Sequence, residues 1–145
     1  MLERLHAHRE WANQRVFDWI LALPEPDEYC LKMFSHILLA EDNVLRRMHG
    51  EIPHDSWQQL TAEELKSLGE ASNAAWRKEL QTDLSRVIRY RLLDGTETES
   101  VAADLATHIC THGVYHRGQI AARAAHMGLH CPPTDFIVFS RLVPG

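Results

Sequence analysis

Residues 108–119 read HICTHGVYHRGQ, and the spacing of the histidines in this stretch is typical of one face of a helix. Its histidines fall at positions 108, 112 and 116, so successive ones lie one turn apart on an α-helix. They continue an apolar stripe that begins with Val101 and Leu105, which predicts a helix from about Val101 to Met127, ended by Gly128. Histidines on a core face need partners, because a buried unpaired polar group costs about 1–3 kcal/mol.

Three earlier segments also show helical periodicity. Apolar residues recur on one face from about Leu2 to Leu23, from about Tyr29 to His49, and from Thr61 to about Leu80. Thr61 and Glu64 have the spacing of a capping box, which marks a helix start. Amphipathic helices with short connections predict an all-α four-helix bundle, with residues 1–145 forming a single domain.

The stretch before the last helix has a different pattern. Residues 86–93 and 96–100 are β-prone and flank Asp94-Gly95, a hairpin-type turn signal. We therefore expect a short β-like excursion before the last helix. Beyond that helix, Pro132-Pro133 predicts an extended tail.

Composition excludes several classes of function. The formal net charge of −5 argues against nucleic-acid binding, which needs a basic surface. No apolar run approaches the roughly 18 residues of a membrane span, and the N-terminus has no apolar signal core. The three cysteines lie far apart in the sequence. These features predict a cytoplasmic protein in a reducing compartment.

The spacing of the histidines favours a metal site shared by two helices. His112 and His116 can turn toward one ion, whereas His108 lies one turn further back and drifts round the helix. His36 lies in mid-helix beside the apolar stripe of the second segment, which makes it the best-placed third ligand. The alternative is that all of these histidines are hydrogen-bonded or exposed residues without a metal. Three neutral imidazoles leave coordination positions open and suit zinc, nickel or iron.

Four motifs resemble the DinB/YfiT-like family of bacterial metal-binding four-helix-bundle proteins, the DNA-damage-inducible type and not the polymerase that shares the label. The first motif is WANQRV at residues 11–16, and the second is SHILLAE at 35–41 with LRRMHG at 45–50. The third and most specific is HxxxHxxxHRGQ at 108–119, and the last is DFI at 135–137. The resemblance covers nearly the whole chain.

The resemblance implies a site with one histidine from the second helix and two from the last, which are His36, His112 and His116 in this sequence. It also implies that His108 supports the ligands or lines the pocket. Imidazole ligands need hydrogen-bonding partners that orient them. The candidates from the sequence are Tyr115, Gln119, Asn43 and Glu41. For Glu41, the pattern favours a solvated position on the helix surface.

Two functions follow from the resemblance. Some relatives are S-transferases in which the metal activates a low-molecular-weight thiol such as bacillithiol or mycothiol, and others are stress-response proteins without an assigned activity. The first hypothesis is thus a metal-dependent thiol S-transferase with a small thiol and an electrophile as partners. The alternative is a non-catalytic metal-binding stress-response protein. The sequence does not decide between them, and DNA binding ranks last because the chain is acidic.

Two further expectations concern partners. Arginines near the motifs are candidates for holding carboxylates of a thiol cofactor, although surface charge is their ordinary role: Arg47, Arg117 and Arg123. Relatives are often dimers, and twofold symmetry is the commonest arrangement. We expect a homodimer, with tryptophans available for its interface: Trp11, Trp19, Trp57 and Trp76.

Overall fold

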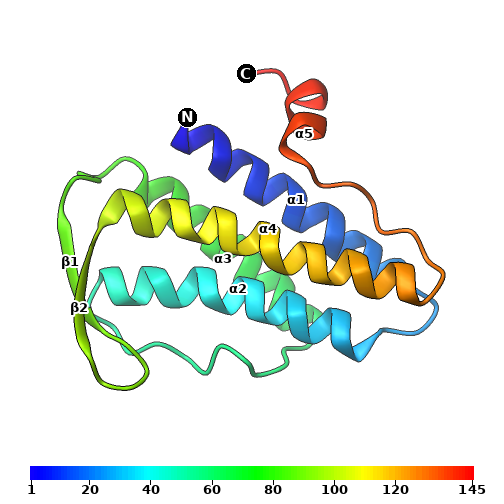
Figure 1. Ribbon diagram of the computed structural model, residues 1–145, viewed down its shortest axis with the longest axis horizontal. Helices are drawn as coiled ribbons and strands as arrows, with labels where there is room; N and C mark the ends of the chain where they lie inside the picture. The colour runs from blue at the N-terminus through cyan, green and yellow to red at the C-terminus, as the bar shows by residue number, and fades with distance from the viewer.

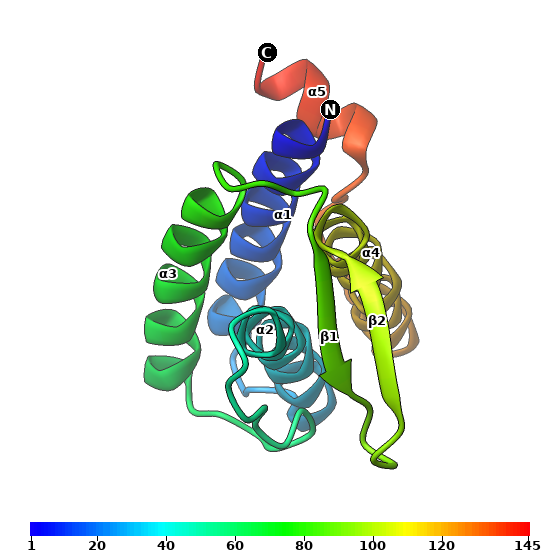
Figure 2. The same ribbon diagram turned by 90° about the vertical axis from the view of Figure 1, so that its left-hand side faces the viewer.

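The computed structural model describes residues 1–145 and consists of long helices closed at one end by a β-hairpin. The elements are α1 (Leu2–Ala22), α2 (Glu28–Met48), α3 (Ala62–Glu79), β1 (Val87–Arg91), β2 (Glu97–Val101), α4 (Ala102–His126) and α5 (Phe136–Leu142). The four long helices lie side by side (Figure 1), and the view from the hairpin end shows both strands crossing in front of the bundle (Figure 2). The predicted all-α bundle with a short β excursion is confirmed. None of the helices has the length and apolar character to cross a membrane.

The hairpin determines where α4 begins. Strands β1 and β2 pair antiparallel, from Val87 opposite Val101 to Arg91 opposite Glu97. Gly95 in the turn has a φ of +84°, a conformation that glycine adopts without a steric penalty. Ile88 is buried in the same apolar cluster as residues of α2. Because β2 runs directly into α4, the docked hairpin sets the direction of the helix that carries the histidine motif.

The core has two apolar clusters with polar residues between them along the helix axes. One cluster joins α1, α2, α3 and α4 and consists of Val16, Phe17, Ile20, Cys30, Met33, Phe34, Ile37, Leu38, Leu65 and Ile120. The other joins α2, α3, β1 and α4 and consists of Val44, Leu45, Met48, Trp76, Ile88, Ala102, Leu105, Ala106, Ile109 and Cys110. Among the buried polar side chains of the helix segments between the two clusters, four are joined by hydrogen bonds, and we call them the polar layer: Arg9, Asn13, Glu41 and Arg117.

The tail after α4 is not wholly extended, so that expectation was wrong. It ends in α5, whose Phe139 is 1% exposed and packs 5.5 Å from the rings of His8 and Trp11. The His8 ring also donates from Nε2 to the carbonyl of Thr134 at 2.6 Å. The guanidinium of Arg4 donates to the carbonyl of Val143, which ties the two termini together. These contacts join residues from opposite ends of the chain, and no local sequence pattern reports them.

Candidate metal centre

The structure brings His36 of α2 together with His112 and His116 of α4. One ring nitrogen from each lies within 4.8 Å of the other two. The ring centroids are 5.1 Å apart for His36 and His112, 4.6 Å for His36 and His116, and 4.4 Å for His112 and His116. This is the trio that the sequence indicated, and its role as a ligand set remains a prediction.

Hydrogen bonds orient two of the three rings. Nδ1 of His36 lies 2.7 Å from the carbonyl oxygen of Ser56, and Nδ1 of His116 lies 2.6 Å from Oε1 of Gln119. Because both partners are acceptors, the proton of each ring is assigned to Nδ1. Each Nε2 therefore presents a lone pair, the form in which histidine binds a metal. The ring of His112 has no such support, since its Nδ1 is buried without a partner.

The donor set fits a divalent cation. Nε2 of His112 lies 3.1 Å from Nε2 of His116, and a single hydrogen between them makes this contact favourable. A cation bound by both nitrogens would take the place of that hydrogen. Burial, followed by the nearby rings of His116 and His36, lowers the pKa of His112 to about 4. Burial also lowers the pKa of His36. Both rings are thus neutral at pH 7, as a metal ligand must be.

Trp57 covers one side of the centre, which the sequence did not predict. Its ring stacks on that of His36 with 3.7 Å between centroids and 7° between planes. It belongs to the segment between α2 and α3 that also supplies the Ser56 carbonyl. Asn43 holds this segment, because its side chain donates to the carbonyl of His54 at 2.9 Å and accepts from the His54 amide at 2.7 Å. The sequence feature that could have indicated this role of Trp57 is a large aromatic residue in a turn-rich stretch, outside any apolar stripe.

The predicted neighbours of the ligands take different positions. Gln119 contacts His116 directly, whereas the ring of His108 is exposed and lies 5.4 Å from that of His112. Tyr115 is 66% exposed and meets His116 edge-on at 5.0 Å. These exposed rings therefore border the solvent side of the centre.

Glu41 is not solvated, so that expectation was wrong. It is fully buried, where Oε2 accepts from Arg9 Nη1 at 2.6 Å and Oε1 accepts from Asn13 Nδ2 at 2.9 Å. Asn13 in turn accepts from Arg117 Nη1 at 2.7 Å, which completes the polar layer beside the histidines. Tertiary contacts from α1 create this environment. The residues next to Glu41 in the sequence do not indicate these contacts.

Several of the arginine and tryptophan candidates are buried or paired with other residues of the chain. Arg117 is 3% exposed, and Arg123 pairs with Asp27 at 2.9 Å. The buried Nε of Arg47 has no partner. Trp76 is fully buried and donates to the backbone of Glu41, so it is not available for an interface.

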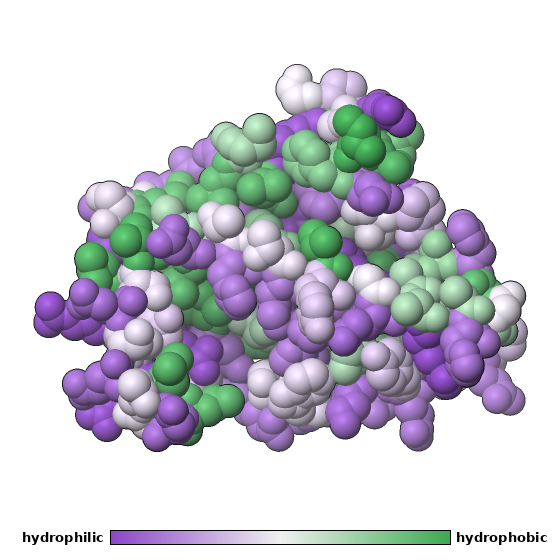
Figure 3. Space-filling view, viewed as in Figure 1, coloured by the Kyte–Doolittle hydropathy of each residue, from purple (hydrophilic) through white to green (hydrophobic).

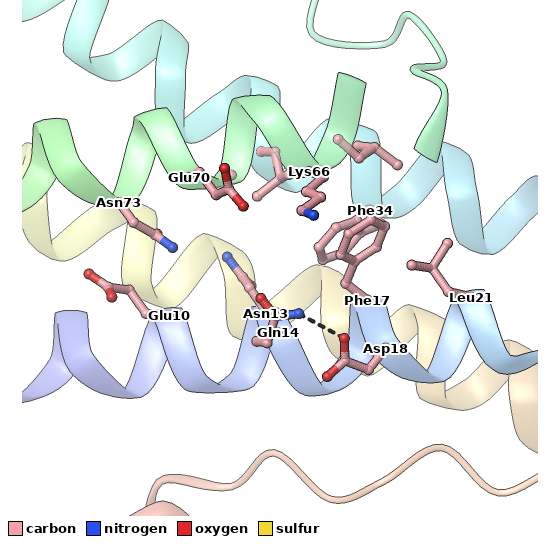
Figure 4. A pocket seen from close by; sticks show the side chains of 13 residues that line it. Glu10, Asn13, Gln14, Phe17, Asp18, Leu21, Phe34, Lys66, Glu70 and Asn73 are labelled. Carbon is pink, nitrogen blue, oxygen red and sulfur yellow. Dashed lines mark hydrogen bonds between the residues drawn. The ribbon is translucent and has the colours of Figure 1, made fainter. Parts of the chain in front are cut away.

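A groove of about 400 Å³ opens between α1 and α3. Phe17 and Phe34 stack in it, and Glu10, Asp18 and Glu70 lie along it (Figure 4). None of the three histidines lines this groove, although Asn13 of the polar layer does.

The fold and the site define a class: helical bundles in which two helices bring histidines to one point suited to a metal ion. The family model described as DinB family matches residues 1–143. Protein DinB of Bacillus subtilis (strain 168) is 22% identical over an alignment of length 156, and this alignment covers 92% of this chain and 90% of that protein. The chain therefore belongs to the DinB family, as its motifs indicated.

Proposed function

We propose that His36, His112 and His116 bind one divalent transition metal and that the protein is a metal-dependent thiol S-transferase. The observation that carries the proposal is the convergence of three imidazoles, with no fourth protein ligand in the group. Structural zinc sites use four protein ligands, whereas catalytic sites keep a position open. A divalent ion bound there supplies a Lewis acid that favours the deprotonated form of a thiol at neutral pH.

The residues around the centre position the reactants in this proposal. Ser56 and Gln119 keep the Nε2 atoms of His36 and His116 directed at one point. Trp57 excludes water from the side on which it stacks. The solvent side, bordered by Tyr115, is where a small thiol and its electrophile enter. The thiol proton passes to solvent, a sulfur–carbon bond forms, and the leaving group departs with its electron pair.

Metal binding without turnover, as in a stress-response protein, is the second candidate. The observation that favours it is that the three histidines line neither the groove between α1 and α3 nor the cleft between α1, α4 and the segment before α5. A centre outside these cavities suits sensing or sequestration better than binding of a bulky substrate.

Alanine variants of the histidines test the metal site. We expect His36→Ala, His112→Ala and His116→Ala each to abolish stoichiometric metal uptake, measured by elemental analysis and calorimetric titration. His108→Ala is the matched control from the same helix and should cost no more than the roughly 10–100-fold of a supporting residue. Loss of the metal in His108→Ala but not in His36→Ala would show that the site lies along α4 alone.

A transfer assay separates the two functions. Metal-loaded and chelator-treated protein are incubated with chlorodinitrobenzene and cysteine, glutathione, coenzyme A or bacillithiol, and release of chloride is followed. Metal-dependent turnover with any of these thiols supports the transferase. A protein that binds metal stoichiometrically but turns over none of them is a metal-binding protein without this activity.

The proposal also includes a cytoplasmic homodimer. Hydrophobic side chains reach the surface over α5 and near the hairpin turn (Figure 3), among them Leu93, Ile137 and Leu142. Light scattering should give about twice the 16.6 kDa of one chain. A mass of one chain at micromolar concentration contradicts the dimer without affecting the metal site.

A further inference from the structure

A second cleft lies between α1, α4 and the segment that leads to α5. Its volume is about 420 Å³, within the range of small-molecule sites. None of the three histidines of the candidate metal centre lines it. Most of its wall is apolar and comes from all three segments, including Leu5, Val16, Val114, Ala121, Pro132 and Phe136.

One buried cation lines this apolar cleft. Arg117 is 3% exposed, and its guanidinium donates from Nη1 to Asn13. Its Nε and Nη2 are buried and have no partner. These two nitrogens form the edge of a guanidinium that binds a carboxylate through two parallel hydrogen bonds. Donors buried without an acceptor are unfavourable, so this edge lacks an anion or an equivalent acceptor.

The charges around Arg117 also indicate that its guanidinium lacks an anion. Glu41 pairs with Arg9 at 2.6 Å, and Glu10, the other carboxylate within 4 Å of Arg9, also pairs with Arg77, so Arg117 has no carboxylate partner of its own. The cleft itself has one acidic residue, Asp135, which is exposed and makes no ion pair with Arg117. His8, the one histidine in the wall, has a pKa lowered by burial and is neutral at pH 7. One negative charge placed at Arg117 would supply that partner.

The groove of Figure 4 does not offer this chemistry. Three carboxylates and one lysine line it, so it repels an anion. We propose that the cleft between α1, α4 and the α5 segment binds a small apolar carboxylate, with its carboxylate on Arg117 and its hydrocarbon part against the apolar wall. This site is separate from the metal centre and does not depend on the proposed function.

Octanoate is the probe, and octanol, with the same chain but no charge, is its control. Binding is measured by calorimetric titration on the full-length protein, both metal-loaded and chelator-treated. We expect saturable octanoate binding in both forms and at least tenfold weaker binding of octanol. His112→Ala should bind octanoate as the wild type does, because a carboxylate bound at the metal centre would be lost in this variant.

Three substitutions locate the site. Arg117→Gln should weaken octanoate about 10–100-fold, the value of a charge-assisted bidentate contact. Ala121→Trp fills the cleft from an exposed position and should abolish binding, whereas Ala122→Trp, on the next residue outside the cleft, should not change it. If Arg117→Gln does not fold, Ala121→Trp and the octanol comparison decide the question.

Three results would overturn the proposal. One is the absence of saturable octanoate binding, which would mean that ordered water alone satisfies Arg117. Another is equal affinity for octanol and octanoate. The third is unchanged octanoate affinity in Ala121→Trp or its loss in His112→Ala, either of which would place the ligand elsewhere.

Discussion

Glu41→Gln removes the carboxylate on which the polar layer depends. Both of its oxygens accept hydrogen bonds, from Arg9 at 2.6 Å and from Asn13 at 2.9 Å. A glutamine has one oxygen, so its amide group must face one of these donors, and Arg9 keeps only the more distant carboxylate of Glu10, at 3.7 Å. Breaking a buried ion pair in this way costs about 3–5 kcal/mol. A domain of this size has about 5–15 kcal/mol in total, so the variant should lose a large part of its stability.

The neighbouring residue supplies a matched control. Asp42→Asn makes the same change of charge one position along α2, but its ion pair with Arg46 is partly exposed. Such surface pairs contribute about 1 kcal/mol or less. Urea denaturation of both variants at pH 7 compares the two losses, provided that the slope of each transition is unchanged. If the two free energies of unfolding fall within about 1 kcal/mol of each other, the polar layer is not what holds the middle of the bundle together.

Two further predictions concern histidines. Gln119→Leu removes the hydrogen bond that orients His116 and should weaken metal binding about 10–100-fold by competition with a chelating dye; an unchanged affinity would exclude this orienting role. Burial, then the charge of Arg9, lowers the pKa of His6 to about 4 in the folded protein, against an ordinary value of 6.5. The unfolded chain therefore binds more protons between these values, so His6 should cost the metal-free protein about 2 kcal/mol of stability between pH 7 and pH 5. His6→Gln should reduce that loss in parallel urea titrations, and an identical pH dependence would contradict the assignment.

The helices and the hairpin were predictable because their signals are local. The capping box at Thr61 forms as predicted, with reciprocal hydrogen bonds to Glu64. The last helix was predicted from Val101 to Met127 and runs from Ala102 to His126. Periodicity, capping residues and turn glycines each act over a few residues, and they specify such elements before any tertiary contact forms.

The candidate site was predictable only in part. His112 and His116 follow from their spacing, and His36 follows from its place in mid-helix. Trp57 and the buried state of Glu41 do not, because both depend on how separate segments meet. A glutamate in a helix looks solvated unless a partner such as Arg9 is known to face it. Buried charges break the apolar pattern on which sequence reasoning relies, and here they do so beside the histidines.

The glycines of α4 test how the metal centre and the polar layer share one helix. His112 and His116 face α2, while Gly113 and Arg117, each one residue further on, face the core beside α1. A Cβ at Gly113 would lie 2.8 Å from Nη1 of Arg117, so the missing side chain lets the guanidinium fold back along its own helix toward Asn13. A Cβ at Gly118, in contrast, meets nothing within 4 Å.

Gly113→Ala and Gly118→Ala should therefore change stability in opposite directions. Replacing glycine by alanine within a helix ordinarily stabilises by about 0.5–1 kcal/mol, and we expect Gly118→Ala to show this gain. Gly113→Ala displaces Arg117 from Asn13 and loses a charge-assisted hydrogen bond of about 1.5–3 kcal/mol, which leaves a net loss of about 1 kcal/mol. Urea denaturation of the two variants measures the difference. Equal gains in the free energy of unfolding would mean that the side chain of Arg117 takes another position without a loss of stability. The spacing of the motif would then matter only for the position of the histidines.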